Sequence, residues 1–249
     1  MDSDEFFDQN IKFYANMKFH KSDQFFLSFI RMDKRKNKKF LDIGGGSGIF
    51  VQTLLGNLND IEISIVDPSE KMLEMVNDKR IKKYHGQLPN PLNIPLSQNF
   101  DYILLRQVLH HITGKTIKNS RQNVSESLKT IKEILDAKGF LLIHEIYFES
   151  YIIPSFSRTI IFYLLKFQKK VKIHFLPKEF LPGLGVCFYT RKELKEILSY
   201  SDFQLIDSYD VSFANTMKKK CLLLKNWGRL LLIAQKNKDN CSTLNHAIG

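Results

Sequence analysis

Residues 39–48 read KFLDIGGGSG, and this stretch decides the fold. Its first half is a short apolar run interrupted by Asp42, as at the end of a buried parallel strand. Its second half contains Gly44, Gly46 and Gly48, which lack a Cβ and let the backbone take positive φ and approach a ligand closely. The apolar residues of Ile49–Leu55 then follow a helical pattern. The stretch therefore predicts a strand, a tight turn and a helix N-terminus, a geometry typical of nucleotide binding.

A second strand pattern strengthens this interpretation. The segment Ile61–Asp67 alternates between apolar and polar residues and ends in an acid, where a carboxylate can accept hydrogen bonds from both hydroxyls of a ribose. The acid at position 42, before the first glycine, also distinguishes DIGGGSG from the GxGxxG fingerprint of dinucleotide-binding proteins. This difference in spacing argues against an NAD-dependent oxidoreductase.

Together, DIGGGSG and Asp67 resemble the first motif and the second-strand acid of class I S-adenosylmethionine-dependent methyltransferases of small-molecule type. The resemblance covers about residues 39–236 and implies S-adenosyl-L-methionine as the cofactor. It implies an α/β, Rossmann-like fold: a seven-stranded, mostly parallel sheet with an antiparallel closing strand and helices on both faces. The segment from Pro68 to Met72 matches the helix start that borders the adenine in this family.

One position near the expected adenine site departs from the family pattern. Relatives commonly carry Gly-Asp-Ala after the third strand, whereas this chain has Gly86, Gln87 and Leu88. A glutamine carbonyl can accept the same hydrogen bond as the aspartate. The residues expected to hold the cofactor are Asp42, Gly44, Gly46, Gly48, Asp67, Pro68, Met72, Gln87, Arg106 and Tyr14.

A pair of histidines follows the predicted fourth strand, Phe100–Arg106. Ligands of open parallel sheets bind at the carboxyl ends of the strands, so His110 and His111 stand where reacting groups are expected. A histidine there can instead cap or pack the next helix. The resemblance favours a catalytic role, and an imidazole with a pKa near 6.5 suits removal of a proton from the acceptor. Because consecutive residues point in different directions, we expect one ring at most to face the acceptor.

The predicted fifth strand, residues 140–147, ends in the polar pair His144 and Glu145. Glu145 can orient an imidazole or hold a substrate amine, and a glutamate that is solvated or paired with lysine is the alternative. An amphipathic helix is predicted before this strand, over Asn123–Ala137, with Gly139 as its stop signal.

The chain is expected to form a methyltransferase domain over residues 39–236, preceded by an N-terminal helical lid at 1–38 and followed by a polar tail at 237–249. The resemblance implies that Tyr14 of the lid reaches the methionine moiety of the cofactor. The aromatic insertion at 148–189 is expected to cover the substrate, with plain core packing as one alternative. A membrane-surface role for residues 160–162, beside Lys166, Lys169 and Lys170, is a further alternative. A capping box at Thr190–Glu193 predicts the helix that follows the insertion.

Composition limits the function classes. The 249 residues carry a formal net charge of +11, but lysines are spread along the whole chain and their clusters lack arginine forks and aromatic interleaving, so a nucleic-acid partner is not favoured. The three cysteines, at 187, 221 and 241, are widely spaced and predict neither a disulfide framework nor a zinc site, and no metal is expected. The acidic N-terminus and the lack of a long apolar run predict neither a secretion signal nor a transmembrane segment, which fits a reducing cytoplasm.

The leading hypothesis is an enzyme that transfers the methyl group of the cofactor to oxygen or nitrogen of a small, partly apolar metabolite. The alternatives are an RNA or other nucleic-acid methyltransferase and a catalytically silent protein that binds the cofactor. The fourth strand ends in Leu-Leu-Arg-Gln rather than the Asn/Asp-Pro-Pro-aromatic run of adenine-amine methylases, which argues against the nucleic-acid alternative. The acceptor itself and the oligomeric state are left open.

Overall fold

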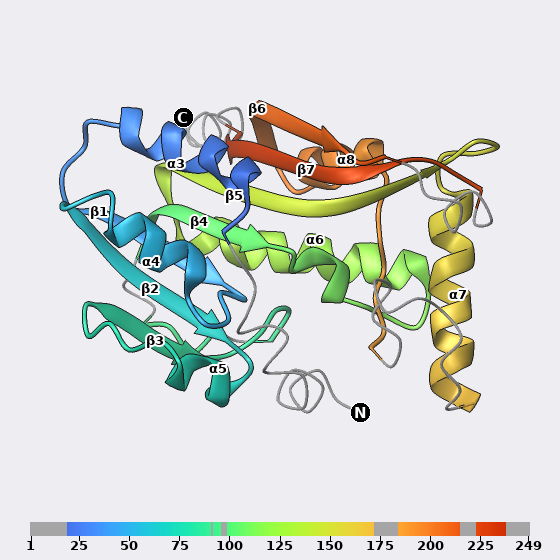
Figure 1. Ribbon diagram of the computed structural model, residues 1–249, viewed down its shortest axis with the longest axis horizontal. Helices are drawn as coiled ribbons and strands as arrows, with labels where there is room; N and C mark the ends of the chain where they lie inside the picture. Colours follow the sequence, from blue (N-terminus) through green and yellow to red (C-terminus); the bar gives the residue numbers. More distant parts are fainter. Residues whose placement is uncertain (1–18, 91, 96–98, 172–183, 215–222, 238–249) are drawn as a thin grey trace, which may run out of the picture.

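A single mixed sheet forms the centre of the computed structural model, which describes residues 19–90, 92–95, 99–171, 184–214 and 223–237. The strands of the described part are β1 (Lys38–Ile43), β2 (Ile61–Asp67), β3 (Ile81–His85), β4 (Phe100–Arg106), β5 (Leu135–Ser150), β6 (Phe203–Ser212) and β7 (Leu224–Lys236). They lie in the order β3-β2-β1-β4-β5-β7-β6 (Figure 1). Strands β1 to β5 pair in parallel, and β7 runs antiparallel to both β5 and β6. The predicted Rossmann-like sheet with an antiparallel closing strand is confirmed.

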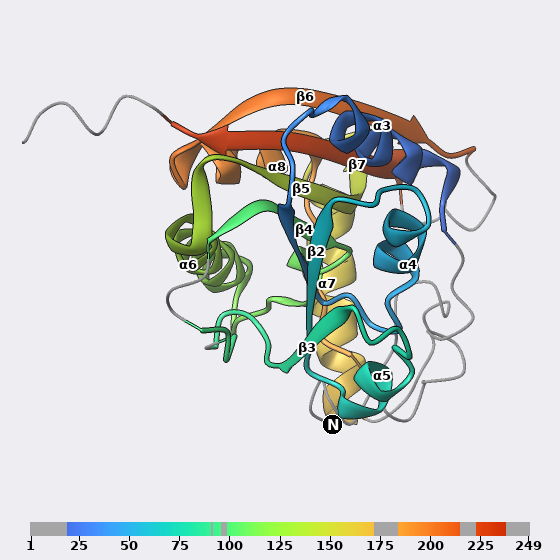
Figure 2. The same ribbon diagram turned by 90° about the vertical axis from the view of Figure 1, so that its left-hand side faces the viewer.

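Helices cover both faces of this sheet, as Figure 2 shows along its edge. On one face lie α3 (Gln24–Met32) and α4 (Ile49–Leu55), and on the other lie α6 (Ile117–Ile134) and α8 (Arg191–Tyr200). Of the shorter elements, η1 (Lys21–Asp23) precedes α3, α5 (Glu70–Glu74) follows β2, and η2 (Leu109–His111) follows β4. A longer helix, α7 (Phe156–Val171), lies beyond the end of β5 and apart from the other helices (Figure 1).

Strand alternation explains why there are two separate cores. Successive side chains of a strand point to opposite faces of the sheet. Phe40 and Leu104 belong to the apolar cluster that also contains residues of α3 and α4, whereas Leu41 and Leu105 belong to the cluster with residues of α6 and α8. The same alternation fixes the face on which each polar side chain near the carboxyl ends of the strands must lie.

The ends of some elements differ from the sequence-based expectation. The helix predicted over Asn123–Ala137 spans Ile117–Ile134, so both of its predicted ends are wrong. Thr116 caps its start by accepting a hydrogen bond from the Asn119 N–H, and Leu135 is already extended and begins β5. Gly139 therefore lies inside β5 rather than ending the helix.

The capping box predicted before α8 is confirmed. The Thr190 hydroxyl oxygen accepts the Glu193 N–H at 3.1 Å, and the Glu193 carboxylate accepts the Thr190 N–H at 2.9 Å. These reciprocal bonds satisfy backbone donors that the first turn of a helix leaves unpaired.

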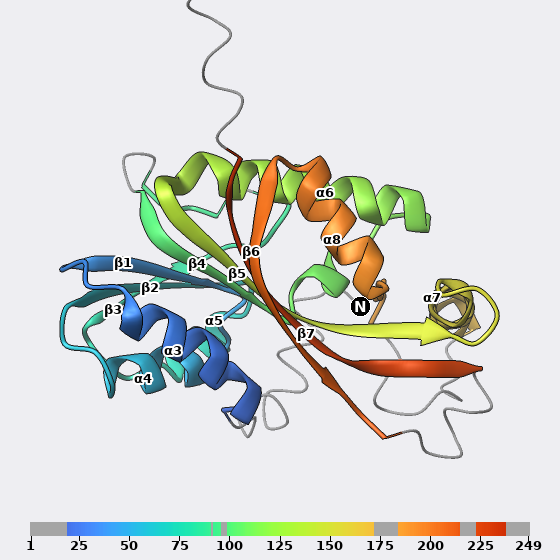
Figure 3. The ribbon, with the colours of Figure 1, turned by 90° about the horizontal axis from the view of Figure 1, so that it is seen from above.

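The insertion after β5 contains a helix, α7, whose buried face packs on the end of the sheet (Figure 3). Ile161 and Leu165 join Phe148, Phe188 and Leu224 in a third apolar cluster. Ile161 and Phe162 are buried, so the membrane-surface alternative based on residues 160–162 was wrong in its residues. Among the described residues, none of the helices combines the length and the apolar character that a membrane span requires.

Candidate active site

The glycine turn between β1 and α4 is close-packed. Gly44, Gly46 and Gly48 all have positive φ, as the sequence pattern predicts. Gly45 was not singled out from the sequence, yet a Cβ placed there would lie 2.6 Å from the Ile65 side chain and 2.8 Å from the Asp42 carboxyl carbon. A side chain at position 45 would therefore displace the acid of β1. The run of three consecutive glycines was the signal available in the sequence.

Asp67, at the end of β2, already holds this turn in place. One carboxylate oxygen accepts the Gly46 N–H at 2.8 Å, and the other accepts the Ser69 N–H at 2.9 Å. The residue is buried, at 6% exposure. Each carboxylate oxygen has more than one lone pair and can accept a further hydrogen bond. The carboxylate thus fixes the turn at the edge of the sheet where the cofactor is expected.

Asp42 is the second buried acid, at the end of β1 and next to the turn. Within the described residues its Oδ1 atom has no hydrogen-bond partner. Burial raises the pKa of Asp42 to about 7; Arg106 opposes this shift, whereas Asp67 and Asp23 add to it. A buried carboxylate with one unpartnered oxygen suits a positively charged ligand group.

Of the remaining residues expected at the cofactor, Met72 packs on the glycine turn, and three others follow strands β2 and β3 or lie outside the described residues. Met72 is buried in α5, and its Cε lies 3.1 Å from where a Cβ of Gly46 would be. The Pro68 carbonyl contacts the His85 ring nitrogen Nε2 at 2.8 Å, just after β2. Gln87 lies in the loop after β3. Tyr14 lies outside the described residues.

Arg106 takes part in a buried ionic cluster that ties the N-terminal segment to the sheet. Its Nε donates to Asp23 Oδ2 at 3.2 Å, and His144 Nδ1 lies 2.7 Å from Asp23 Oδ1. Asp23 and His144 are fully buried. Burial opposes ionisation of Asp23, but its contacts with His144 and Arg106 hold the pKa of the carboxyl below its usual value. The cluster therefore keeps an ionised carboxylate in the interior.

His20 completes this cluster from the residue before η1. Its backbone N–H donates to Asp23 Oδ2 at 3.3 Å, and its ring meets the His144 ring edge-on at 5.9 Å between centroids. Burial, together with Arg229 and Arg106, lowers the pKa of His20 to about 4. Neither His20 nor Asp23 was predicted to lie at the site, because Arg106 and His144, which join them to the sheet, are far along the chain.

The clearest catalytic geometry lies on the opposite face of the sheet. His110 Nδ1 lies 2.7 Å from Glu145 Oε2, and Glu145 Oε1 accepts the Leu109 N–H at 2.7 Å. Both side chains are buried, at 2% and 0% exposure. The glutamate thus holds the imidazole and the backbone of the η2 turn together. Of the alternatives considered for Glu145, this geometry corresponds to the one in which it orients an imidazole.

The two histidine rings lie side by side. Their centroids are 4.1 Å apart, and both rings belong to η2, a single turn of 3-10 helix. His110 is buried and His111 is half-buried, so the expectation that at most one ring faces the acceptor stays a prediction. Desolvation, together with the adjacent His110, holds the pKa of His111 well below its usual value.

The histidine turn touches both the glycine turn and the insertion. Val108 packs so closely on Gly44 that a Cβ there would lie 2.5 Å from its Cγ2 atom. On the other side, the Cys187 N–H donates to the His110 carbonyl at 2.8 Å, and the Phe188 ring stacks on the His110 ring at 5.3 Å between centroids. The histidine pair thus lies between the glycine turn and residues 187–188 of the insertion.

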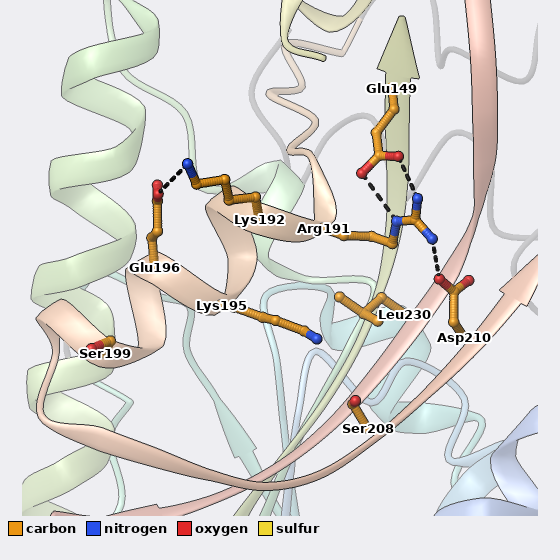
Figure 4. Close-up of a pocket in the computed structure, with 9 residues that line it drawn as sticks. All are labelled: Glu149, Arg191, Lys192, Lys195, Glu196, Ser199, Ser208, Asp210 and Leu230. Carbon is orange, nitrogen blue, oxygen red and sulfur yellow. Dashed lines mark hydrogen bonds and ion pairs between the residues drawn. The ribbon is translucent and has the colours of Figure 1, made fainter.

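An open pocket of about 650 Å³ lies elsewhere, between α8 and the strands β5 and β6 (Figure 4). Ion pairs cross it: Arg191 binds both oxygens of Glu149 and also contacts Asp210 at 2.6 Å. None of the residues predicted for the site lines this pocket. We attribute these charges to the attachment of α8 to the sheet.

A family model described as a methyltransferase domain matches residues 19–208. The chain belongs to this methyltransferase family. Its sheet, glycine turn and second-strand acid are those of the class I S-adenosylmethionine-dependent members, and S-adenosyl-L-methionine is the cofactor of this group.

Individual relatives agree with this assignment. A protein of Staphylococcus carnosus (strain TM300), described as an uncharacterized methyltransferase, is 32% identical over 113 residues, which make up 45% of this chain and 49% of that protein. The chain thus spans about half the length of this curated relative. Among solved structures, LepI in complex with S-adenosylmethionine has a TM-score of 0.53 at 15% identity, covering 82% of this chain and 44% of LepI. An O-methyltransferase family 2 protein from Planctomyces limnophilus DSM 3776, in complex with apigenin, has a TM-score of 0.54 at 17% identity, covering 81% and 51%.

Proposed function

We propose that this methyltransferase transfers the methyl group of S-adenosylmethionine to an oxygen or nitrogen atom of a small, partly apolar acceptor, with His110 accepting the proton that leaves. The observation that carries the proposal is the buried His110–Glu145 pair at the carboxyl edge of the sheet. The pair lies near the glycine turn, because Val108, just before the histidine turn, packs on Gly44. Methyl-transferring neighbours that hold small molecules support the acceptor class.

The glycine turn and the acids beside it would hold the cofactor. Asp67 has further acceptor capacity for the ribose hydroxyls, and the unpartnered Oδ1 of Asp42 suits the cofactor's ammonium group. Met72 lies against the turn, where it can pack on the adenine. When bound, the cofactor supplies a methyl group activated by the neighbouring sulfonium. The residues present therefore fit the cofactor of the family.

The Glu145 carboxylate would set the tautomer of His110. The carboxylate would accept a hydrogen bond from the Nδ1–H group of His110. The unprotonated nitrogen, Nε2, would then be the basic one, and it faces away from the glutamate. His110 is 2% exposed, so an acceptor reaches its ring only when neighbouring side chains such as Phe188 move. Exclusion of water from this site strengthens the electrostatic effect of the glutamate on the imidazole. His111 is the poorer base because its pKa is held well below the usual value.

The segments on either side of the site would cover the acceptor. Phe188 and Cys187 bring the insertion at 148–189 into contact with His110, which supports its role as a substrate lid. At the N-terminus, Asp23 anchors the residues before α3 to Arg106 and His144 at the carboxyl edge of the sheet. These contacts support the proposal that residues 1–38 form a lid.

The first experiment tests the reaction class. The full chain is incubated with S-adenosylmethionine and, in separate mixtures, a panel of phenols, amines and bulk transfer RNA, and formation of S-adenosylhomocysteine is measured. We expect product with a small acceptor. Methylation of RNA alone would establish the nucleic-acid alternative, and cofactor binding without any product would establish the silent one.

The second experiment tests the base with the neighbouring histidine as its matched control. His110→Asn should lower turnover on the accepted substrate by roughly a hundredfold to ten-thousandfold, the usual scale of general base catalysis. His111→Asn should have a much smaller effect, and both variants should bind the cofactor as the parent does. Full turnover of His110→Asn across the pH range would show that catalysis proceeds by positioning alone.

A further inference from the structure

Exposed apolar side chains gather at one end of the molecule. Of the thirteen large apolar residues that are exposed in the described part of the chain, eight belong to the β5–α7 connection, to α7 and to the residue before β7. We name these eight the apolar edge: Tyr151, Ile152, Ile153, Phe156, Tyr163, Phe167, Val171 and Leu223. Such a concentration on a monomer's surface marks an interaction site more often than scattered exposed residues do.

The exposed residues of α7 form one stripe. Phe156, Tyr163, Phe167 and Val171 follow spacings of seven, four and four residues, which place side chains on the same side of a helix with 3.6 residues per turn. The buried residues of α7, such as Ile161 and Leu165, lie on the opposite side and pack on the sheet. The helix therefore has two apolar faces, and only one of them packs on the described core.

The stripe continues into the loop before α7. Tyr151, Ile152 and Ile153 are 60%, 65% and 59% exposed. The Tyr151 N–H donates to the Leu223 carbonyl at 3.1 Å, which places Leu223 beside this loop. The loop and the helix both lie at the far end of β5 and β7, away from the other helices (Figures 1 and 3). The edge is thus one continuous surface.

The charge around this edge has one sign. Residues 150–171 contain Arg158, Lys166, Lys169 and Lys170 and no aspartate or glutamate. Arg158 is buried against Glu193, and Lys166 donates to the Gly114 carbonyl at 3.1 Å. Lys169 and Lys170 are exposed in the last turn of α7, and at about 100° per residue Lys170 lies on the side of the apolar stripe, whereas Lys169 lies on the other side. An apolar surface with only positive charges beside it is complementary to the interface of a membrane with anionic lipids.

We propose that the apolar edge docks this protein on an anionic membrane surface. Its aromatic and aliphatic side chains enter the interface, and Lys170, beside the stripe, faces the lipid phosphates. Two copies of the chain would meet at this edge with like charges, which disfavours self-association. Four of the eight side chains of the edge are aliphatic and offer no ring on which a base could stack, whereas aromatic and aliphatic side chains alike can enter a membrane interface, which favours the membrane over a single-stranded nucleic acid.

Sedimentation with lipid vesicles tests this proposal on the full chain. One set of vesicles contains phosphatidylcholine alone, and the other contains equal parts of phosphatidylcholine and phosphatidylglycerol. We expect the protein to sediment with the anionic vesicles, less at high salt, and far less with the neutral ones. The absence of binding to anionic vesicles would overturn the proposal.

Variants then assign the binding to the edge. The double variant Ile152→Ser with Phe167→Ser should lower the partition coefficient about tenfold or more, because both side chains lose apolar contact with the interface. The variant Lys170→Gln should lower it about fivefold, the effect of one lysine near an anionic surface. Tyr200→Ser is the control, since Tyr200 is 77% exposed on α8 and outside the edge.

Two further measurements separate this outcome from others. All variants should bind S-adenosylhomocysteine as the parent does, because their side chains are exposed and outside the candidate active site. Equal loss of vesicle binding in the Tyr200→Ser control would overturn the assignment to the edge. Binding of a single-stranded RNA oligonucleotide in place of vesicles, or a dimer in light scattering that Phe167→Ser abolishes, would overturn the membrane proposal.

Discussion

Replacing Asp67 by alanine tests how the glycine turn is held and whether the same carboxylate binds the cofactor. The carboxylate accepts the Gly46 N–H at 2.8 Å and the Ser69 N–H at 2.9 Å in a buried setting. A hydrogen bond to a charged group contributes about 1.5 to 3 kcal/mol. Water entering the vacated space restores part of both bonds, so we expect Asp67→Ala to lower the free energy of unfolding by about 3 kcal/mol.

Two assays separate the roles of the carboxylate. At about 2 to 4 °C per kcal/mol for a chain of this size, the loss corresponds to a thermal midpoint lower by roughly 6 to 12 °C. Calorimetric titration with S-adenosylhomocysteine, carried out where the variant is folded, should show affinity weakened by a further ~1.5 to 3 kcal/mol from the ribose hydrogen bonds. That loss corresponds to about tenfold to 150-fold in the dissociation constant.

A residue on the same strand provides the control. The Glu62 side chain is 52% exposed on β2 and contacts Lys82 at 3.5 Å, so Glu62→Ala should change stability by less than about 0.5 kcal/mol and leave cofactor binding unchanged. An unaltered thermal midpoint in Asp67→Ala would refute the role of the carboxylate in holding the turn. A lower midpoint with unaltered affinity would refute its role as the ribose ligand.

Three further changes test neighbouring features. Gly45→Ala should weaken cofactor binding at least tenfold in calorimetry, because the added Cβ would lie 2.6 Å from a side chain of β2, whereas Gly56→Ala, with its nearest neighbour at 3.6 Å, should bind normally. The pKa of Asp42 is raised to about 7, so the free energy of unfolding should fall by up to ~4 kcal/mol as the pH rises from about 4 to about 7. Asp42→Asn should flatten this pH profile in thermal unfolding, and a variant with the parent's profile would contradict the assignment. Arg158→Ala removes the buried partner of the Glu193 carboxylate and leaves it the more exposed Arg121 at 3.6 Å, so it should cost about 1.5 to 3 kcal/mol in urea unfolding, and a loss below about 1 kcal/mol would contradict this.

The sequence sufficed for the parts of the fold that depend on local patterns. The predicted second and fourth strands, Ile61–Asp67 and Phe100–Arg106, agree with β2 and β4 residue for residue, because alternation and apolar runs are local signals. The capping box before α8 is local as well. The end of α6 was misplaced because Leu135 pairs with Phe100 of β4, a contact that local pattern does not reveal.

The candidate site divides in the same way. The glycine turn and Asp67 were found from spacing alone. The three predicted glycines have positive φ, a conformation that favours residues without a Cβ. The partners of Arg106 were not found, since Asp23 lies 83 residues earlier in the chain. Contacts over such separations depend on which strand lies next to which, and this order is a property of the whole sheet.

Strand alternation then accounts for the different partners of His144 and Glu145 at the end of β5. Leu142 lies in the cluster on the α3 side and Ile143 in the cluster on the α6 side, so His144 must point toward α3 and Glu145 toward α6. His144 accordingly meets Asp23 of the N-terminal segment, and Glu145 meets His110. Two consecutive residues at the carboxyl edge therefore each hold a segment on a different face of the sheet: His144 holds the N-terminal segment, and Glu145 holds the histidine turn. A one-residue shift in the register of β5 would exchange them and separate both pairs at once.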